Sequence, residues 1–135
     1  MSPAEPIKFD VHTRHRTDFV EITSQVADQV HRFARQAGVL TLFIPHTTAG
    51  ITINENADPD VATDMMMFLD RLVPRNAGYR HTEGNADSHI KASLLGSSVR
   101  VILQDGHMML GTWQGIYLCD FDGPRVRQVW LHIES

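Results

Sequence analysis

From Ser98 onward the sequence alternates short apolar runs with turn residues, and this pattern constrains the fold most strongly. Strands are expected over 98–103, 107–110, 112–119 and 127–133. Asp105-Gly106 lies between the first two runs and is a dipeptide typical of a tight hairpin turn. Strands joined by such short connections pair antiparallel, so the last third of the chain predicts an antiparallel sheet.

The first two thirds of the chain mix strand and helix patterns. Strands are expected over 7–15, 19–22, 39–44 and 51–53, and helices over 23–37, 58–72 and 86–95. Thr23 is the expected cap of the first helix, Asp58 of the second and Asn85 of the third, and Gly38 and Gly96 are expected to end the first and third. Two or three helices with about six strands predict an α+β fold with a mostly antiparallel sheet.

Composition excludes several classes of protein. The 135 residues suit one domain spanning 1–135, with 1–6 as a loose N-terminal arm. A net charge of −4 argues against a nucleic-acid binder, which needs a basic surface. No apolar run is long enough to span a bilayer, and the start resembles no signal peptide. The single cysteine, Cys119, cannot form an intrachain disulfide, which fits a cytoplasmic location, and its apolar strand pattern predicts a buried, inert thiol.

Two short polar blocks, 46–58 and 81–89, contain most of the reactive side chains. Together they hold three of the eight histidines, and small residues are interleaved with them. A fold has little structural use for so many imidazoles and carboxylates in one place. The blocks therefore indicate a metal or anion site.

The three histidines are His46, His81 and His89. With nearby carboxylates they suit a divalent metal, zinc rather than magnesium, with an open position for water or substrate. Glu83 or Asp87 could accept hydrogen bonds from the ligating imidazoles. The alternative is that the histidines bind carboxylates and no metal.

Other residues of the blocks have a structural and a functional interpretation. Asp58 is explained as a helix cap. Glu55 could ligate a metal, act as a base or be solvated. Thr47 and Thr48 could bind phosphate oxygens or lie in a turn, and Asn56 and Asn85 could orient a ligand or serve turns and caps. Backbone N–H groups at the start of the third helix favour a bound anion.

Two later segments add candidates for ligand binding. Trp113-Gln114 lies between two glycines, so Trp113 could stack on a ligand ring or pack in the core or in an interface. Arg125 follows a turn and could clamp a phosphate, or it could be a solvated hairpin residue.

Four ordered motifs carry a resemblance to a known family. They are HTTAGITINENAD at 46–58, EGNADSHIKASLLGSS at 83–98, LGTWQGIY at 110–117 and FDGPR at 121–125. The chain resembles the YjbQ-like family, which is often labelled secondary thiamine-phosphate synthase, from about Ile7 to Ile133. It departs from the family pattern at Ser88, where alanine is usual, and at Asp120, where glutamate is usual.

The resemblance implies an α+β fold, a homotrimer and a site near His46, His81 and His89 that a neighbouring subunit could complete. It implies an enzyme that joins a pyrimidine pyrophosphate to a thiazole phosphate. In that hypothesis the three histidines hold the metal, and Glu55 or Glu83 transfers a proton. The residues that position the phosphorylated ligand would be Thr47, Thr48, Asn56 and Arg125. The alternatives are a metal-dependent hydrolase of a phosphorylated metabolite and a non-enzymatic binding protein.

Overall fold

The computed structural model describes residues 5–33 and 36–135, and its elements follow the expected order. The strands are β1 (Ile7–His12), β2 (Asp18–Glu21), β3 (Gly38–Phe43), β4 (Ala49–Glu55), β5 (Ser98–Gln104), β6 (His107–Met108), β7 (Gln114–Asp120) and β8 (Val126–Glu134). The helices are α1 (Thr23–Arg32), α2 (Pro59–Leu72) and α3 (Ala86–Leu95). Residues 1–4 of the expected N-terminal arm lie outside the described residues.

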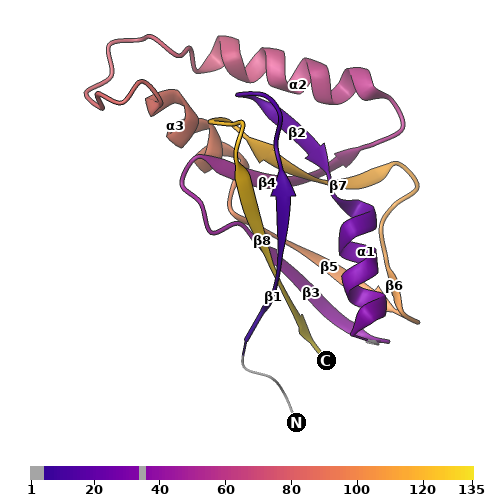
Figure 1. The fold of residues 1–135 in the computed structure, drawn as a ribbon. Helices are drawn as coiled ribbons and strands as arrows, with labels where there is room; N and C mark the ends of the chain where they lie inside the picture. The colour runs from indigo at the N-terminus through magenta and orange to yellow at the C-terminus, as the bar shows by residue number, and fades with distance from the viewer. Residues whose placement is uncertain (1–4, 34–35) are drawn as a thin grey trace.

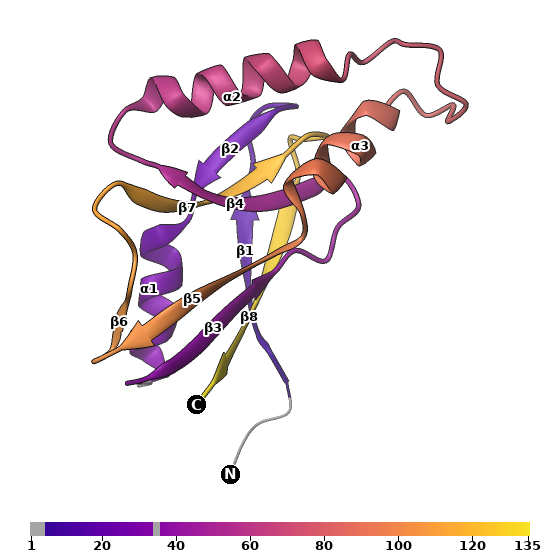
Figure 2. The ribbon, with the colours of Figure 1, turned by 180° about the vertical axis from the view of Figure 1, so that it is seen from behind.

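The strands form two sheets, and every neighbouring pair is antiparallel, which confirms the predicted α+β class. One sheet has the order β1-β8-β3-β5-β6 and the other the order β2-β7-β4. Helix α2 runs across the three-stranded sheet, and α3 lies beside β4 (Figures 1 and 2). The polar segments before β4 and before α3 therefore end on the same side of the molecule.

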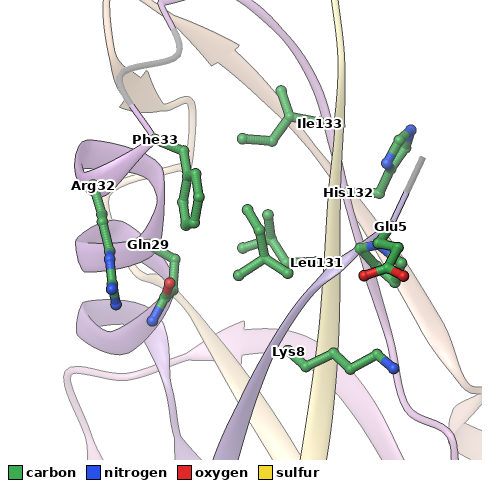
Figure 3. A pocket seen from close by; sticks show the side chains of 10 residues that line it. Glu5, Lys8, Gln29, Arg32, Phe33, Leu131, His132 and Ile133 are labelled. Atoms are coloured by element: carbon green, nitrogen blue, oxygen red, sulfur yellow. The ribbon is translucent and has the colours of Figure 1, made fainter. Parts of the chain in front are cut away.

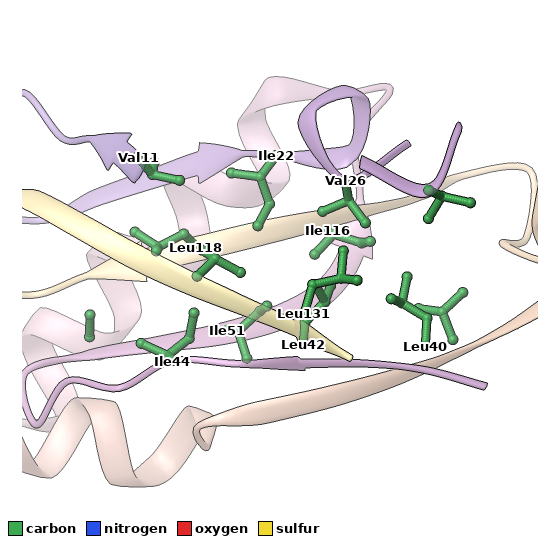
Figure 4. Packing of buried hydrophobic residues seen from close by; sticks show 14 of the residues in the cluster. Val11, Ile22, Val26, Leu40, Leu42, Ile44, Ile51, Ile116, Leu118 and Leu131 are labelled. Carbon is green, nitrogen blue, oxygen red and sulfur yellow. The ribbon is translucent and has the colours of Figure 1, made fainter. Parts of the chain in front are cut away.

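Apolar side chains from both sheets and from α1 form the main core, as Figure 4 shows. Strand β7 illustrates how the sequence produces this, because side chains alternate between the two faces of a strand. Ile116 and Leu118 lie in the core between the sheets, whereas Tyr117 and Cys119 pack on the other face in a second apolar cluster with Ala92 of α3. Cys119 is fully buried, as predicted, and burial raises the pKa of its thiol.

Helix α1 is shorter than predicted. It buries Val26 and Val30, but it ends at Arg32, and Gly38 opens β3 instead of ending the helix. Residues 34 and 35 of the predicted helix lie outside the described residues. Thr23 is not the cap: its hydroxyl donates to Glu21 and accepts from the backbone N–H of Ile116. The hydroxyl predicted to cap the helix thus accepts a hydrogen bond from β7 instead.

Helix α2 begins as predicted. The side chain of Asp58 accepts a hydrogen bond of 2.9 Å from the backbone N–H of Asp60, and Pro59 occupies the first turn. None of its fourteen residues is fully buried, and its apolar side chains Met67, Phe68 and Leu72 are exposed. No helix among the described residues has both the length and the apolar character required to cross a bilayer.

Helix α3 has the predicted ends but not the predicted cap. Asn85 makes no capping hydrogen bond: its amide N–H donates to Asp122 at 2.9 Å, and its Oδ1, the atom that would accept from the helix, is buried without a partner. At the other end the helix comes very close to β4 at Gly50. A Cβ atom on Gly50 would lie 2.8 Å from the carbonyl oxygen of Gly96, so only glycine permits this approach. The close packing fixes α3 against the strand that follows His46.

Candidate functional site

A pocket of about 500 Å³ lies between the segment before β4 and one face of α3. We name it the His46 pocket; its lining residues are His46, Thr47, Ala49, His89, Ala92, Ser93, Gly96 and Ser97. The contributions from α3 are spaced three or four residues apart, as one face of a helix requires. The structure therefore brings together His46 and His89, which are 43 positions apart in the sequence.

His46 occupies a gap that the end of β3 leaves in the larger sheet. The pairing of β3 with β8 ends at Phe43 and Trp130, so the N–H of Gln128 has no partner strand on that side. It donates instead to Nε2 of His46 at 2.9 Å. A backbone N–H can only donate, so Nε2 carries the lone pair and the proton of the neutral ring lies on Nδ1.

The surroundings of His46 favour this neutral form. Burial lowers the pKa of His46, and the positive charges of Arg127 and Arg125 lower it further, although the carboxylate of Asp120 opposes them. His46 therefore presents an N–H donor at neutral pH.

A second pocket, of about 380 Å³, adjoins the first at His89. We name it the His81 pocket; its lining residues are Tyr79, Arg80, His81, Ala86, His89 and Ile90. The rings of His81 and His89 meet edge to face with centroids 5.3 Å apart, and Nε2 of His81 lies 3.1 Å from a carboxylate oxygen of Glu83. The structure thus places His81, Glu83 and His89 together, as the second polar block predicts.

The predicted three-histidine metal site is not assembled. Within residues 5–33 and 36–135 no three histidine, cysteine, aspartate or glutamate side chains converge as metal ligands would. The Nε2 lone pair of His46 is committed to Gln128, and Nδ1 holds the proton, so this ring has no free lone pair. The donor set of His46, His81 and His89 therefore does not fit a metal in this geometry.

Asp87, expected to support the imidazoles, takes part in a different contact, in which its own carboxylate and Lys91 are buried. Its carboxylate accepts from Arg16 at 3.0 and 3.1 Å and from Lys91 at 2.9 Å, and Lys91 also donates to Asp70 at 2.7 Å. Burial alone would raise the pKa of Asp87, but the hydrogen bonds and charges of Arg16 and Lys91 outweigh it and lower the pKa to about 2. These ion pairs fix the orientation of α3 and hence of His89.

A second buried ion pair lies behind His46. Arg127 donates to Asp120 at 2.6 Å and to the hydroxyl of Thr48 at 2.8 Å, and Thr13 donates to Asp120 at 2.7 Å. Thr48 is therefore buried in this network and does not line the His46 pocket, in contrast to the exposed Thr47. The network joins the two sheets through β7 and β8.

Sequence reasoning missed four of these charged residues: Arg16, Lys91, Asp120 and Arg127. For two of them the spacing in the sequence predicts the contact or the burial. Lys91 follows Asp87 by four positions, the spacing of neighbours on a helix. Arg127 alternates with Val129 and Leu131, so it shares their buried face of β8.

Asn85 and Arg125 both engage Asp122 and do not line the His46 pocket. The guanidinium of Arg125 donates to the carboxylate of Asp122 at 3.0 Å and to its carbonyl oxygen at 2.7 Å. Asn85 donates to the same carboxylate, and its own Oδ1 is buried without a partner. Arg125 thus acts on His46 through its charge and not through direct contact with the pocket.

The remaining predicted site residues lie at the opposite end of β4. The strand begins at Ala49 and ends at Glu55, which separates Glu55 from the His46 pocket by roughly 20 Å. There Gln114 pairs with Glu55, the amide of Asn56 donates to Glu21 at 2.8 Å, and Trp113 is exposed. The structure therefore does not bring Glu55, Asn56, Trp113 or Gln114 to the histidines.

Another cavity, of about 450 Å³, lies between α1 and the strands β1 and β8 and is shown in Figure 3. Phe33, Leu131 and Ile133 give it an apolar wall, and Arg32 and Gln29 line it from the helix. None of the residues predicted for the site lines this cavity.

Comparison with known proteins identifies relatives over nearly the whole chain. The family model described as "UPF0047 protein YjbQ-like" matches residues 7–135. A UPF0047 protein of Methanocaldococcus jannaschii is 46% identical over 126 residues, covering 93% of this chain and 91% of the relative. The UPF0047 protein YugU of Bacillus subtilis is 45% identical over 122 residues, covering 90% and 92%.

Solved structures share this fold. An uncharacterised YjbQ/UPF0047 protein from Clostridium acetobutylicum has a TM-score of 0.92 and 48% identity, covering 95% of this chain and 99% of that one. The hypothetical protein APE1520 from Aeropyrum pernix also has a TM-score of 0.92, at 31% identity and with 97% and 98% covered. These likenesses establish the fold and the family, and they give no support to the finer expectation of thiamine-phosphate synthase activity. The chain belongs to the YjbQ-like UPF0047 family.

Proposed function

We propose that the His46 pocket binds the phosphate group of a small phosphorylated metabolite and that His89 transfers a proton in its conversion. The observation that carries the proposal is the lining of the pocket. Two imidazoles and the hydroxyls of Thr47 and Ser97 line it, the hydroxyl of Ser93 donates to the carbonyl oxygen of His89, and none of its described lining residues is acidic. Such a set of donors suits an anion with several acceptor oxygens.

Electrostatics supports an anionic ligand. His46 offers its Nδ1–H as a donor, because Nε2 is fixed by Gln128. The guanidinium groups of Arg127 and Arg125 act on His46 from behind the pocket, and the positive potential that lowers the pKa of His46 also attracts a phosphate. His46 is therefore assigned to binding and orientation.

His89 is the better candidate for proton transfer. No described residue forms a hydrogen bond with its ring nitrogens, so either nitrogen can accept or donate a proton. It lines both pockets, at the point where they adjoin. A ligand bound in the His46 pocket thus places its ester oxygen beside this imidazole.

Two reactions fall within the proposal. The first is the condensation that the family resemblance implies, in which the thiazole nitrogen displaces pyrophosphate from the pyrimidine. The second is hydrolysis of a phosphate ester, in which water replaces the alcohol and inorganic phosphate is released. A panel of phosphate monoesters and the thiazole–pyrimidine pair distinguishes them by the product, pyrophosphate or phosphate. If the protein binds phosphate but converts neither the phosphate monoesters nor the thiazole–pyrimidine pair, the proposed catalysis is wrong and the protein only binds its ligand.

Binding of inorganic phosphate tests the proposal directly. The wild type is expected to bind phosphate in titration calorimetry, and Thr47→Val is expected to weaken binding roughly tenfold, because a hydrogen bond to a charged oxygen is lost. The matched control is Thr112→Val, in an exposed loop outside the pocket. Absence of phosphate binding by the wild type, or equal weakening in both variants, would overturn the proposal.

The divalent metal stays a prediction, and the same calorimeter tests it. A zinc site that uses the second polar block predicts stoichiometric zinc binding that is lost in His81→Ala. If zinc produces no saturable heat, or if His81→Ala binds it equally well, the metal prediction is wrong. Phosphate binding measured without metal separates the two questions.

We also propose that the protein assembles as a homotrimer, as the family resemblance implies. Large exposed apolar side chains support self-association: Met67, Phe68 and Leu72 on α2, and Phe43 at the end of β3. Light scattering is expected to give a mass three times that of the 15.2 kDa chain. A monomer mass at the concentrations used for calorimetry would contradict the proposal.

A further inference from the structure

We propose that the His81 pocket holds an aromatic or heteroaromatic ring of the same ligand whose phosphate occupies the His46 pocket. This inference rests on the proposed function, because it assigns the part of the ligand that extends past His89. The ligand class would then be a phosphate ester with a flat ring close to the ester oxygen.

The two pockets lie side by side along α3 and share one lining residue, His89. His89, Ala92 and Ser93 face one pocket, and Ala86, His89 and Ile90 face the other, so two adjacent stripes of the helix share one residue. A ligand that contacts His89 from the His46 pocket therefore has a second cavity of about 380 Å³ directly beside it. This volume is large enough for a single ring.

The lining of the His81 pocket includes the rings of Tyr79, His81 and His89, and each ring has a contact within the protein. The hydroxyl of Tyr79 donates to the carbonyl oxygen of Pro74 at 2.6 Å, which holds the phenol ring. Glu83 lies 3.1 Å from Nε2 of His81, and the ring of His81 meets that of His89 at 83°. Fixed rings offer stacking and edge contacts at little cost in conformational entropy.

The other lining residues fit a flat apolar group. Ile90 is 39% exposed although it is apolar, and Ala86 adds a small apolar side chain at the start of α3. Arg80 lines the same pocket and has a planar guanidinium that can stack on a ring. Burying a ring here would cover Ile90 and use the cation of Arg80.

Three ligands that differ in one feature test this inference: inorganic phosphate, ethyl phosphate and phenyl phosphate. In titration calorimetry with the full chain, phenyl phosphate is expected to bind roughly tenfold more tightly than ethyl phosphate, because only phenyl phosphate stacks in the His81 pocket. Inorganic phosphate reports on the His46 pocket alone.

Two variants locate the effect. Ala86→Leu fills the His81 pocket and is expected to reduce the affinity for phenyl phosphate to that for ethyl phosphate, with the affinity for inorganic phosphate unchanged. The control is Leu94→Ala, which removes an exposed side chain of the same helix outside both pockets. Leu94→Ala should keep the tenfold preference.

The outcomes separate this inference from the proposed function. If inorganic phosphate binds but phenyl and ethyl phosphate bind equally well, the ring site is wrong and the phosphate site stands. If the preference for phenyl phosphate persists in Ala86→Leu, the ring binds elsewhere and the inference is overturned. If inorganic phosphate does not bind to the wild type, the proposed function itself fails.

Discussion

Replacing Asp87 with alanine is expected to destabilise the protein by about 3–5 kcal/mol, because it removes the buried carboxylate that pairs with both Arg16 and Lys91 and leaves the buried Lys91 ammonium with only the exposed Asp70. Lys91 is only 1% exposed and Asp87 is fully buried, so water cannot compensate for the loss. Chemical denaturation monitored by circular dichroism measures the change in the free energy of unfolding. The control is Asp64→Ala on the exposed surface of α2, where a change within about 0.5 kcal/mol is expected.

A double variant tests whether the ion pair itself is the cause. Asp87→Leu combined with Lys91→Met removes both charges and fills the space with apolar atoms, so it should cost less than the two single variants together. If the effects of the single variants simply add, the coupling between Asp87 and Lys91 that we infer is absent.

The same carboxylate makes stability dependent on pH. The pKa of Asp87 is about 2 in the folded protein and near 3.8 without these contacts, so the unfolded chain takes up the proton first as pH falls. The stabilisation is complete above about pH 4 and is lost as pH falls towards 2. A shift of this size corresponds to about 2 kcal/mol, which should be missing from the acid denaturation profile of Asp87→Ala.

Replacing His89 with glutamine is expected to lower the catalytic rate about 10²- to 10⁴-fold, the usual contribution of a general acid or base. The rate is that of phosphate or pyrophosphate release, measured on whichever member of the substrate panel the wild type converts. Glutamine retains hydrogen-bonding capacity, so the affinity for inorganic phosphate should change far less than the rate. A loss confined to binding would show that His89 only positions the ligand.

The control for His89 is His12→Gln, because His12 is exposed on β1 and lines neither pocket. Full activity in His12→Gln excludes a general effect of removing an imidazole. If His89→Gln is as active as the wild type, the assignment of His89 to proton transfer is wrong.

Local sequence signals predicted the elements better than the contacts between them. Asp58 caps α2 as expected, since both partners of that hydrogen bond lie within two residues. Asn85 and Thr23 are predicted to cap helices in the same way, but the amide N–H of Asn85 donates to Asp122 and the hydroxyl of Thr23 accepts from the N–H of Ile116. A distant partner of this kind becomes visible only once the sheets are assembled.

The predicted site residues lie at opposite ends of β4 for a similar reason. The sequence predicts a strand of three residues at 51–53, which would keep both ends of the first polar block in neighbouring loops. Pairing with β7 extends β4 to seven residues, so the block runs along a strand and its two ends point to opposite sides of the molecule. His46 and His89 meet because β4 and α3 pack together at Gly50, and no local sequence pattern predicts this contact.

Helix α2 contributes no fully buried side chain, although it is the longest helix of the described chain. Its exposed surface can therefore change from one family member to another without loss of the fold, whereas β7 and α3 cannot vary so freely. If α2 provides contacts between subunits, the strength of assembly can evolve separately from chain stability. This separation would let the strength of assembly change by substitutions on α2 while the His46 and His81 pockets keep their shape.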